Sequence, residues 1–164
     1  MSPMQKISVE ERVLLRHTLA TVAYRAGKTL RDAPPSFGDF SCGEGGRTPR
    51  QILAHIGDLY DWALSIAIGK QVWRDAEPLP WQKEADRFFA SLKRFDDYLA
   101  EQGELHETSA ALFQGPIADS LTHIGQLAML RRMAGHKMKG ENYHKAEIVA
   151  GRVGVEQAAP HREF

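Results

Sequence analysis

The chain has 164 residues and a mass of 18.4 kDa, which is the size of one compact domain. Its 21 basic and 21 acidic residues give a formal charge of zero and a pI near 7.1. This balance argues against a nucleic-acid-binding protein, which needs an excess of basic residues to neutralise phosphates, and against a polybasic membrane-surface protein. A hydrophobic content of 43% with 26% charged residues is typical of globular proteins, so extended disorder is not expected.

The contents of cysteine and histidine narrow the kinds of site that the chain can form. A single cysteine, Cys42, cannot make an internal disulfide or a zinc cluster built from cysteines. The start of the chain shows no signal-peptide pattern, and the longest strongly apolar stretch, 62–68, is far shorter than a membrane span, so we expect a cytoplasmic protein. Seven histidines ionise near neutral pH, and they are His17, His55, His106, His123, His136, His144 and His161.

The first helix is predicted to begin after Ser8, because Glu11, three residues later, completes a capping-box pattern. Gly27 is its predicted end. The predicted buried stripe recurs at helical spacing and consists of Val9, Val13, His17, Ala20 and Tyr24. A loop rich in proline and glycine follows over 32–46.

The second helix is predicted from Pro49 to the glycine at 69, with Thr48 as its N-terminal cap and Gln51 at the third helical position. Its predicted buried side chains are Ile52, Ile56, Leu59, Ala63 and Ile66. At about 100° per residue, His55 lies within the same apolar arc.

The third helix has the clearest pattern in the sequence and is predicted to end at Gly103. Apolar residues alternate at spacings of four and three, as on the inward face of a bundle helix. They are Trp81, Ala85, Phe88, Leu92, Phe95 and Leu99.

The last helix is predicted to begin near Glu107 and to be interrupted at Gly115 and Pro116, because proline cannot continue the hydrogen-bond ladder of a helix. A long segment should then run from Pro116 to about Ala134, after which 136–164 form an irregular tail. Four amphipathic helices without a convincing strand predict an all-α protein, a four-helix bundle over about 8–135 within a single domain of 1–164.

A candidate metal site emerges from the second and last helices. Asp119 and His123 are four residues apart, so they share one helix face, and a carboxylate and an imidazole at this spacing can bind a metal in a bundle. The alternative is an ordinary Asp–His ion pair at the rim of the core. His55 alone would be a hydrogen-bonded core residue, but the three residues together match a facial triad of two histidines and one carboxylate.

Other residues are weaker candidates. Gln126, one turn beyond His123, could orient a ligand or the substrate, or could form a hydrogen bond between helices. His17, Tyr24 and Trp62 are candidates for pocket lining, with core packing as the alternative, and Tyr143 is a further candidate in the tail. The remaining histidines are expected at the surface, and nothing near Cys42 in the sequence would lower the pKa of its thiol.

Two segments resemble motifs of the DinB-like (DinB/YfiT-type) superfamily. Residues 48–58, TPRQILAHIGD, resemble the second-helix motif of these proteins. Residues 123–127, HIGQL, followed by LRR at 130–132 and Gly135, resemble the motif of their last helix. With the number and order of helices, the resemblance covers most of 8–135, and the tail motifs at 140–143 and 151–154 are similar to an uncharacterised branch of the superfamily.

The resemblance implies a four-helix bundle with up-down-down-up connectivity that forms a homodimer in many members. It also implies a divalent metal, with Zn, Ni, Fe or Mn as candidates, held by one histidine of the second helix and a His-x-x-x-His pair of the last. Characterised relatives include transferases and isomerases that use a low-molecular-weight thiol, and other members are assigned as metal-dependent hydrolases. The implied partner is a small-molecule substrate.

Carried over to this chain, His55 matches the first ligand and His123 matches the second histidine of the pair. Asp119 stands where the family has the first histidine of that pair. Aspartate is a competent ligand that favours harder metals than three imidazoles do. The substitution is also compatible with a branch that has lost its metal and binds small molecules without catalysis, or acts in a stress response.

Overall fold

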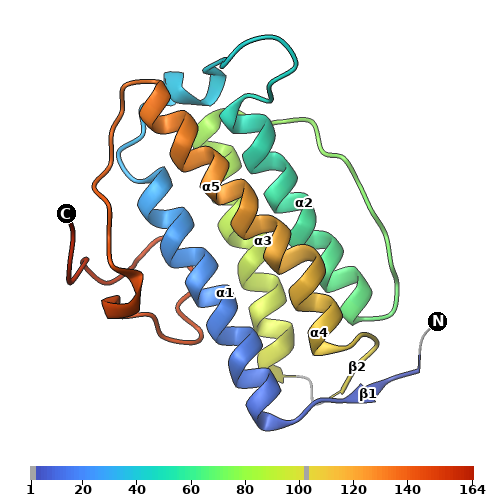
Figure 1. Ribbon diagram of the computed structural model, residues 1–164. Coiled ribbons are helices and arrows are strands. Elements are labelled where there is room, and N and C mark those ends of the chain that lie inside the picture. The colour runs from blue at the N-terminus through green and yellow to red at the C-terminus, as the bar shows by residue number, and fades with distance from the viewer. Residues whose placement is uncertain (1–2, 102–103) are drawn as a thin grey trace.

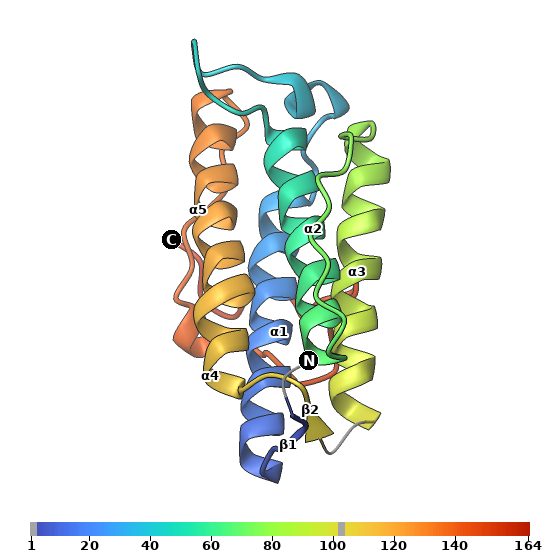
Figure 2. The ribbon, with the colours of Figure 1, turned by 90° about the vertical axis from the view of Figure 1, so that its right-hand side faces the viewer.

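The computed structural model describes residues 3–101 and 104–164. As predicted, the protein is mostly helical, and four long helices lie side by side (Figures 1 and 2). They are α1 (Val9–Leu30), α2 (Pro49–Ala67), α3 (Trp81–Glu101) and α5 (Ala118–Met133). Helices α2 and α3 pack together, and α1 and α5 each contact the other and one member of that pair, so all four enclose a common core.

Two of the helix starts follow from the local sequence. The side chain of Ser8 accepts a hydrogen bond from the backbone of Glu11, and the carboxylate of Glu11 accepts one from the backbone of Ser8. Thr48 and Gln51 repeat this reciprocal pair at the start of α2. Each capping box satisfies N–H groups that the first turn would otherwise leave without partners, so both predicted boundaries are confirmed.

The inward face of α3 is also confirmed, since all six residues of its predicted apolar pattern are buried. Phe37, in the short 3-10 helix η1 (Pro35–Asp39), packs edge-on against Trp81 with ring centroids 5.2 Å apart. This contact closes one end of the core. The predicted end of α3 at Gly103 lies outside the described residues.

The predicted buried face of α1 is wrong at its beginning. Val9 is 67% exposed, Val13 is 55% exposed, and His17 is exposed, although Ala20 and Tyr24 are buried as expected. The core contacts come from a stripe displaced around the helix, namely Leu15, Leu19, Val22, Ala23, Ala26 and Leu30. Apolar residues lie on more than one side of the first turns of α1, so periodicity alone could not select the face that packs.

Gly27 does not end α1. The helix continues to Leu30, and the carbonyl of Gly27 accepts a hydrogen bond from the backbone N–H of Arg31. Gly27 is buried, and a side chain there would meet Gln157 of the tail. Gly27 is therefore an ordinary helical position that faces the tail, and it does not terminate the helix.

The interruption predicted at Gly115 and Pro116 is found at that position, but it is a π-helical turn and not a break in the helix. The short helix α4 (Ser109–Leu112) passes through a π-helical turn, η2 (Phe113–Ile117), directly into α5. A π turn holds one more residue than an α turn, so it accommodates the proline ring and the missing N–H without ending the helix.

The structure contains two strands that the sequence did not predict. Strands β1 (Gln5–Lys6) and β2 (Glu104–Leu105) form a short antiparallel pair at one end of the bundle. They hold the start of the chain against the segment before α4, and Leu105 is fully buried there. A pair of two-residue strands is too short to produce a recognisable alternation of apolar and polar residues.

The segment over 136–164 is irregular, as predicted, and runs along the outside of the bundle beside α1 (Figure 1). It contains the short 3-10 helix η3 (Tyr143–Lys145) and an isolated antiparallel bridge between Glu141 and Glu163, and buried side chains attach it to α1. Glu141 is buried and accepts hydrogen bonds from Tyr24 at 2.5 Å and from Lys28 at 2.7 Å. Among the described residues, no helix combines the length and the apolar character that a membrane span requires.

Candidate metal centre

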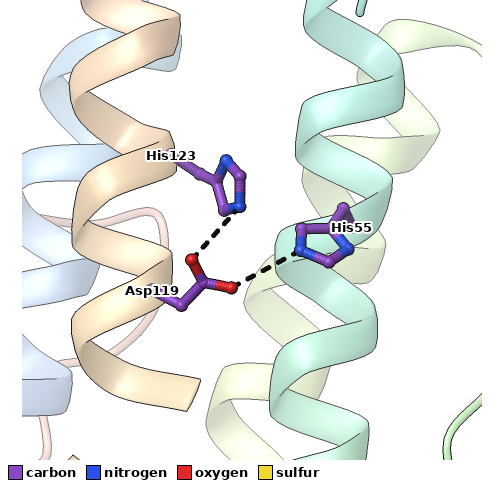
Figure 3. Close-up of side chains that lie close together, drawn as sticks. All are labelled: His55, Asp119 and His123. Carbon is purple, nitrogen blue, oxygen red and sulfur yellow. Dashed lines mark ion pairs between the residues drawn. The ribbon is translucent and has the colours of Figure 1, made fainter. Parts of the chain in front are cut away.

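Three side chains from two helices converge at the face between α2 and α5. His55 projects from α2, Asp119 and His123 project from α5, and all three point toward one another (Figure 3). The two residues of α5 lie on the same face because they are one helical turn apart. The packing of α2 against α5 then places His55 opposite them.

The two oxygens of Asp119 are directed at different histidines. Oδ1 lies 3.4 Å from Nε2 of His123, and Oδ2 lies 3.6 Å from Nε2 of His55. Two ligands on a tetrahedral ion with bonds of about 2.0–2.2 Å are about 3.4 Å apart, so both separations fit ligands that share one ion. The ligand atoms of all three residues lie within 4.8 Å of one another, and closing the longest separation takes a movement of at most about 1.4 Å.

Burial and charge favour the neutral form of His55. Its side chain is 20% exposed, and burial lowers its pKa below the usual value. The positive charges of His123 and Arg47 lower this pKa further, while Asp119 opposes the shift. A neutral imidazole is the form that binds a metal, so the surroundings of His55 reduce competition from protons.

A second interaction sets the orientation of His123. Nδ1 of its ring lies 2.8 Å from the side-chain oxygen of Gln126, one turn further along α5. Nε2 is left to face Asp119. The contact lies within α5, so the alternative of a hydrogen bond between helices is wrong for this pair, and the geometry is the one that an outer partner of a metal-bound histidine would have.

Two tryptophans cover the site from the side of the connection between α2 and α3. The ring of Trp73 lies edge-on to His55 with centroids 5.6 Å apart, and Trp62 lies edge-on to Trp73 at 5.9 Å. Trp62 was a predicted pocket residue, and it lines a shallow hollow that also includes Asp119. Trp73 was missed, because the chain over 68–80 is irregular and no periodicity places its side chains.

A hollow of about 370 Å³ opens on the other side of His123. It is bounded by Arg47 and Cys42 from the loop before α2, by Ile52 of α2, and by the α5 residues that follow His123. The site is therefore open to small molecules, and the side chain of Asp119 is 46% exposed. The side chain of His123, in contrast, is 14% exposed.

The structure does not bring the remaining candidates to this site. His17 is exposed on α1, and Tyr24 and Tyr143 contact each other edge-on with ring centroids 6.3 Å apart. These two tyrosines belong to the contact between α1 and the tail, where burial raises the pKa of Tyr24. Tyr143 also lies under the guanidinium of Arg25.

No family model matches the chain, and neither the curated proteins nor the solved structures include a match.

Proposed function

We propose that this protein is a divalent-metal-dependent enzyme of the DinB-like type that acts on a small molecule. The single observation that carries the proposal is the convergence of His55, Asp119 and His123, with ligand atoms within 4.8 Å of one another. A site of three protein ligands leaves coordination positions for water or substrate, which is typical of catalytic rather than structural metal sites.

The arrangement of the helices supports the connectivity that the resemblance implies. In Figure 1, the colour gradient runs upward along α1 and α5 and downward along α2 and α3, which corresponds to an up-down-down-up order. The segment over 68–80 makes the long return that two consecutive parallel helices need. The proposal includes a cytoplasmic location and a homodimer, as expected from the sequence, with no nucleic-acid or membrane partner.

Two reaction classes suit this site, a hydrolase and a transferase that uses a low-molecular-weight thiol. A divalent ion, when bound, would supply the Lewis acidity that either reaction needs. Asp119 contributes a negative charge, which favours harder ions such as Mn or Fe more than three imidazoles would, while the two histidines also suit Zn and Ni. Gln126 holds the ring of His123, and Trp73 shields one side of His55 from water.

The second candidate is a bundle that binds small molecules without catalysis. One observation favours it: Asp119 approaches both histidines within ion-pair distance, so the three side chains satisfy one another without an ion. The two candidates differ in what happens to added metal, because an ion pair alone has no need of a divalent cation.

The experiment is a metal analysis of protein purified without chelators, followed by titration of apo protein with Zn, Ni, Mn and Fe(II). The enzyme proposal predicts one ion per chain and loss of tight binding in His55→Ala and His123→Ala. His17→Ala, an exposed histidine on α1, is the matched control and should bind like the wild type. Absence of stoichiometric binding, or equal binding by all four proteins, would favour the non-catalytic bundle.

Activity assays on the metal-loaded protein separate the two reaction classes. Hydrolysis of para-nitrophenyl acetate reports hydrolase chemistry, and addition of free cysteine to styrene oxide reports thiol transfer. In either case the rate should fall to that of the apo protein in His123→Ala, and His17→Ala should retain the wild-type rate.

A further inference from the structure

The hollow beside His123 combines one basic group with an apolar wall. Arg47 and Gln126 provide its polar atoms next to His123. Its apolar side is formed by Ile52, Met129 and Leu130. Such a mixture of a few polar groups and apolar side chains is typical of sites for small organic molecules.

Arg47 has no carboxylate partner among the residues that the structure describes, although acidic residues are present in the same loop. Arg50, three residues later, is paired through its Nε with Asp39 at 2.9 Å. Arg47 therefore offers an unused guanidinium at the edge of the hollow, and guanidinium binds carboxylates through paired N–H donors.

The charge around the hollow is positive once the candidate metal centre holds a divalent ion. A divalent ion with two neutral histidines and one aspartate leaves a net charge of +1, and Arg47 adds another. An electropositive cleft of this kind concentrates anions.

We propose that this hollow is a substrate subsite for a small organic acid, in which Arg47 binds a carboxylate and Ile52, Met129 and Leu130 contact an apolar body. A single guanidinium matches a singly charged head group, and this is the reason for assigning a carboxylate. The reacting end of the molecule then lies toward His123. The inference names the substrate class of the proposed enzyme and rests on that function.

The test measures binding of hexanoate and of its neutral analogue hexanamide by isothermal titration, with zinc-loaded and with apo protein. We expect hexanoate to bind the zinc-loaded wild type and the Arg50→Gln control with equal affinity. Arg47→Gln should weaken hexanoate binding about tenfold, because a hydrogen-bonded charge pair is lost, and should leave binding of hexanamide unchanged. Arg47→Lys should recover part of the loss.

Alkylation of Cys42 by iodoacetamide localises the bound molecule. Cys42 is the only cysteine of the chain, is exposed, and lines the same hollow. Hexanoate should slow its alkylation in the wild type and in Arg50→Gln, and should do so less in Arg47→Gln at equal concentration. Circular dichroism of each variant checks that the helices are retained.

Three results would overturn the subsite: equal hexanoate affinity in Arg47→Gln and the wild type, no preference for hexanoate over hexanamide, or a wild-type Kd above about 10 mM. These results are separable from failure of the metal centre, since zinc content is measured on the same samples. Full zinc occupancy with no effect of Arg47→Gln rejects the subsite and leaves the enzyme proposal standing. Loss of zinc with Arg47-dependent binding intact rejects the metal centre alone.

Discussion

The side-chain oxygen of Gln126 lies 2.8 Å from Nδ1 of His123. Because an amide oxygen can only accept a hydrogen bond, Nδ1 carries a proton when this contact is made, and in the neutral form of the ring Nε2 then keeps a free lone pair. Nε2 is the atom that faces Asp119. The hydrogen bond thus selects the tautomer of His123 that a metal at this site requires.

Gln126→Ala should therefore weaken zinc binding by about 10- to 100-fold, the usual cost of removing a partner that orients a metal-bound histidine. Gln126→Glu keeps an acceptor in place and should retain most of the affinity. Competition with a zinc-binding dye measures both. Gln114→Ala, an exposed glutamine in the π-helical turn, is the control, and equal affinities in Gln126→Ala and this control would contradict the orienting role.

Substitutions of Asp119 test whether this residue is a ligand. Asp119→Ala should reduce zinc affinity by more than about a hundredfold. Removing a residue that only orients a ligand can already reduce metal affinity by up to about a hundredfold, and removing a ligand should cost more. Asp119→His should raise the preference for zinc over manganese, because imidazole replaces a hard oxygen ligand. Titrations with both metals give the ratio of the two dissociation constants. An unchanged ratio in Asp119→His, or wild-type affinity in Asp119→Ala, would leave Asp119 as an ion-pair partner only.

Trp73 provides an optical test of the same site. Its ring centroid is 5.6 Å from that of His55, so a paramagnetic ion bound by His55 would quench its fluorescence. Addition of Co²⁺ should quench the wild type, and this quench should become smaller in Trp73→Phe and be largely lost in Trp62→Phe/Trp73→Phe, because Trp62 lines a hollow with Asp119. In Trp81→Phe, which alters the contact with Phe37, the quench should persist. A quench that the double variant leaves intact would place the ion elsewhere.

The parts of the fold that were predicted correctly depend on neighbouring residues. Ser8 and Glu11 form their hydrogen bonds within one helical turn. The residues from Trp81 to Leu99 follow a pattern of spacings of four and three that defines a single apolar face. Errors arose where packing decides between local options. Val9 and Val13 are apolar yet exposed, and Pro116 lies in a π turn whose geometry no sequence rule identified.

The candidate site depends partly on local spacing within one helix and partly on packing between segments that are far apart in the sequence. The spacing of Asp119 and His123 places them on one face without reference to the rest of the chain. Their meeting with His55 depends on α2 packing against α5, which the facial-triad pattern and the resemblance suggested but which no spacing within one helix determines. The loop residues Arg47 and Trp73 join the site through irregular segments, and no periodic pattern predicts such contacts.

The buried contact between α1 and the tail should contribute to stability. Glu141 accepts hydrogen bonds from Tyr24 and Lys28, and the side chain of Lys28 is almost completely buried. Glu141→Ala should lower the free energy of unfolding by about 2 kcal/mol, because it leaves a buried ammonium with one carboxylate partner fewer. Urea denaturation measures the change. Glu147→Ala removes an exposed pair with Arg152 and should cost less than about 0.5 kcal/mol, so equal losses in the two variants would contradict the argument.

The pH dependence of stability tests the second carboxylate of this contact. The hydrogen bond from Lys28 lowers the pKa of Glu163 below its usual value, burial opposes this shift, and the charges of Lys28 and Lys139 add to the lowering. In the unfolded chain the pKa of a glutamate is about 4.3. The ion pair therefore stabilises the folded state above that pH, and its contribution is lost as the pH falls through the lower folded value.

The wild type should accordingly be more stable than Glu163→Gln at pH 7, and this difference should shrink on acidification from about pH 5 to pH 3.5. Urea denaturation across this range measures it. Glu156→Gln is the matched control, because Glu156 is exposed in the same tail and has no ion-pair partner among the described residues. Its difference from the wild type should be small at every pH. A difference between the wild type and Glu163→Gln that does not vary with pH would mean that Glu163 stabilises the tail through packing and not through its charge.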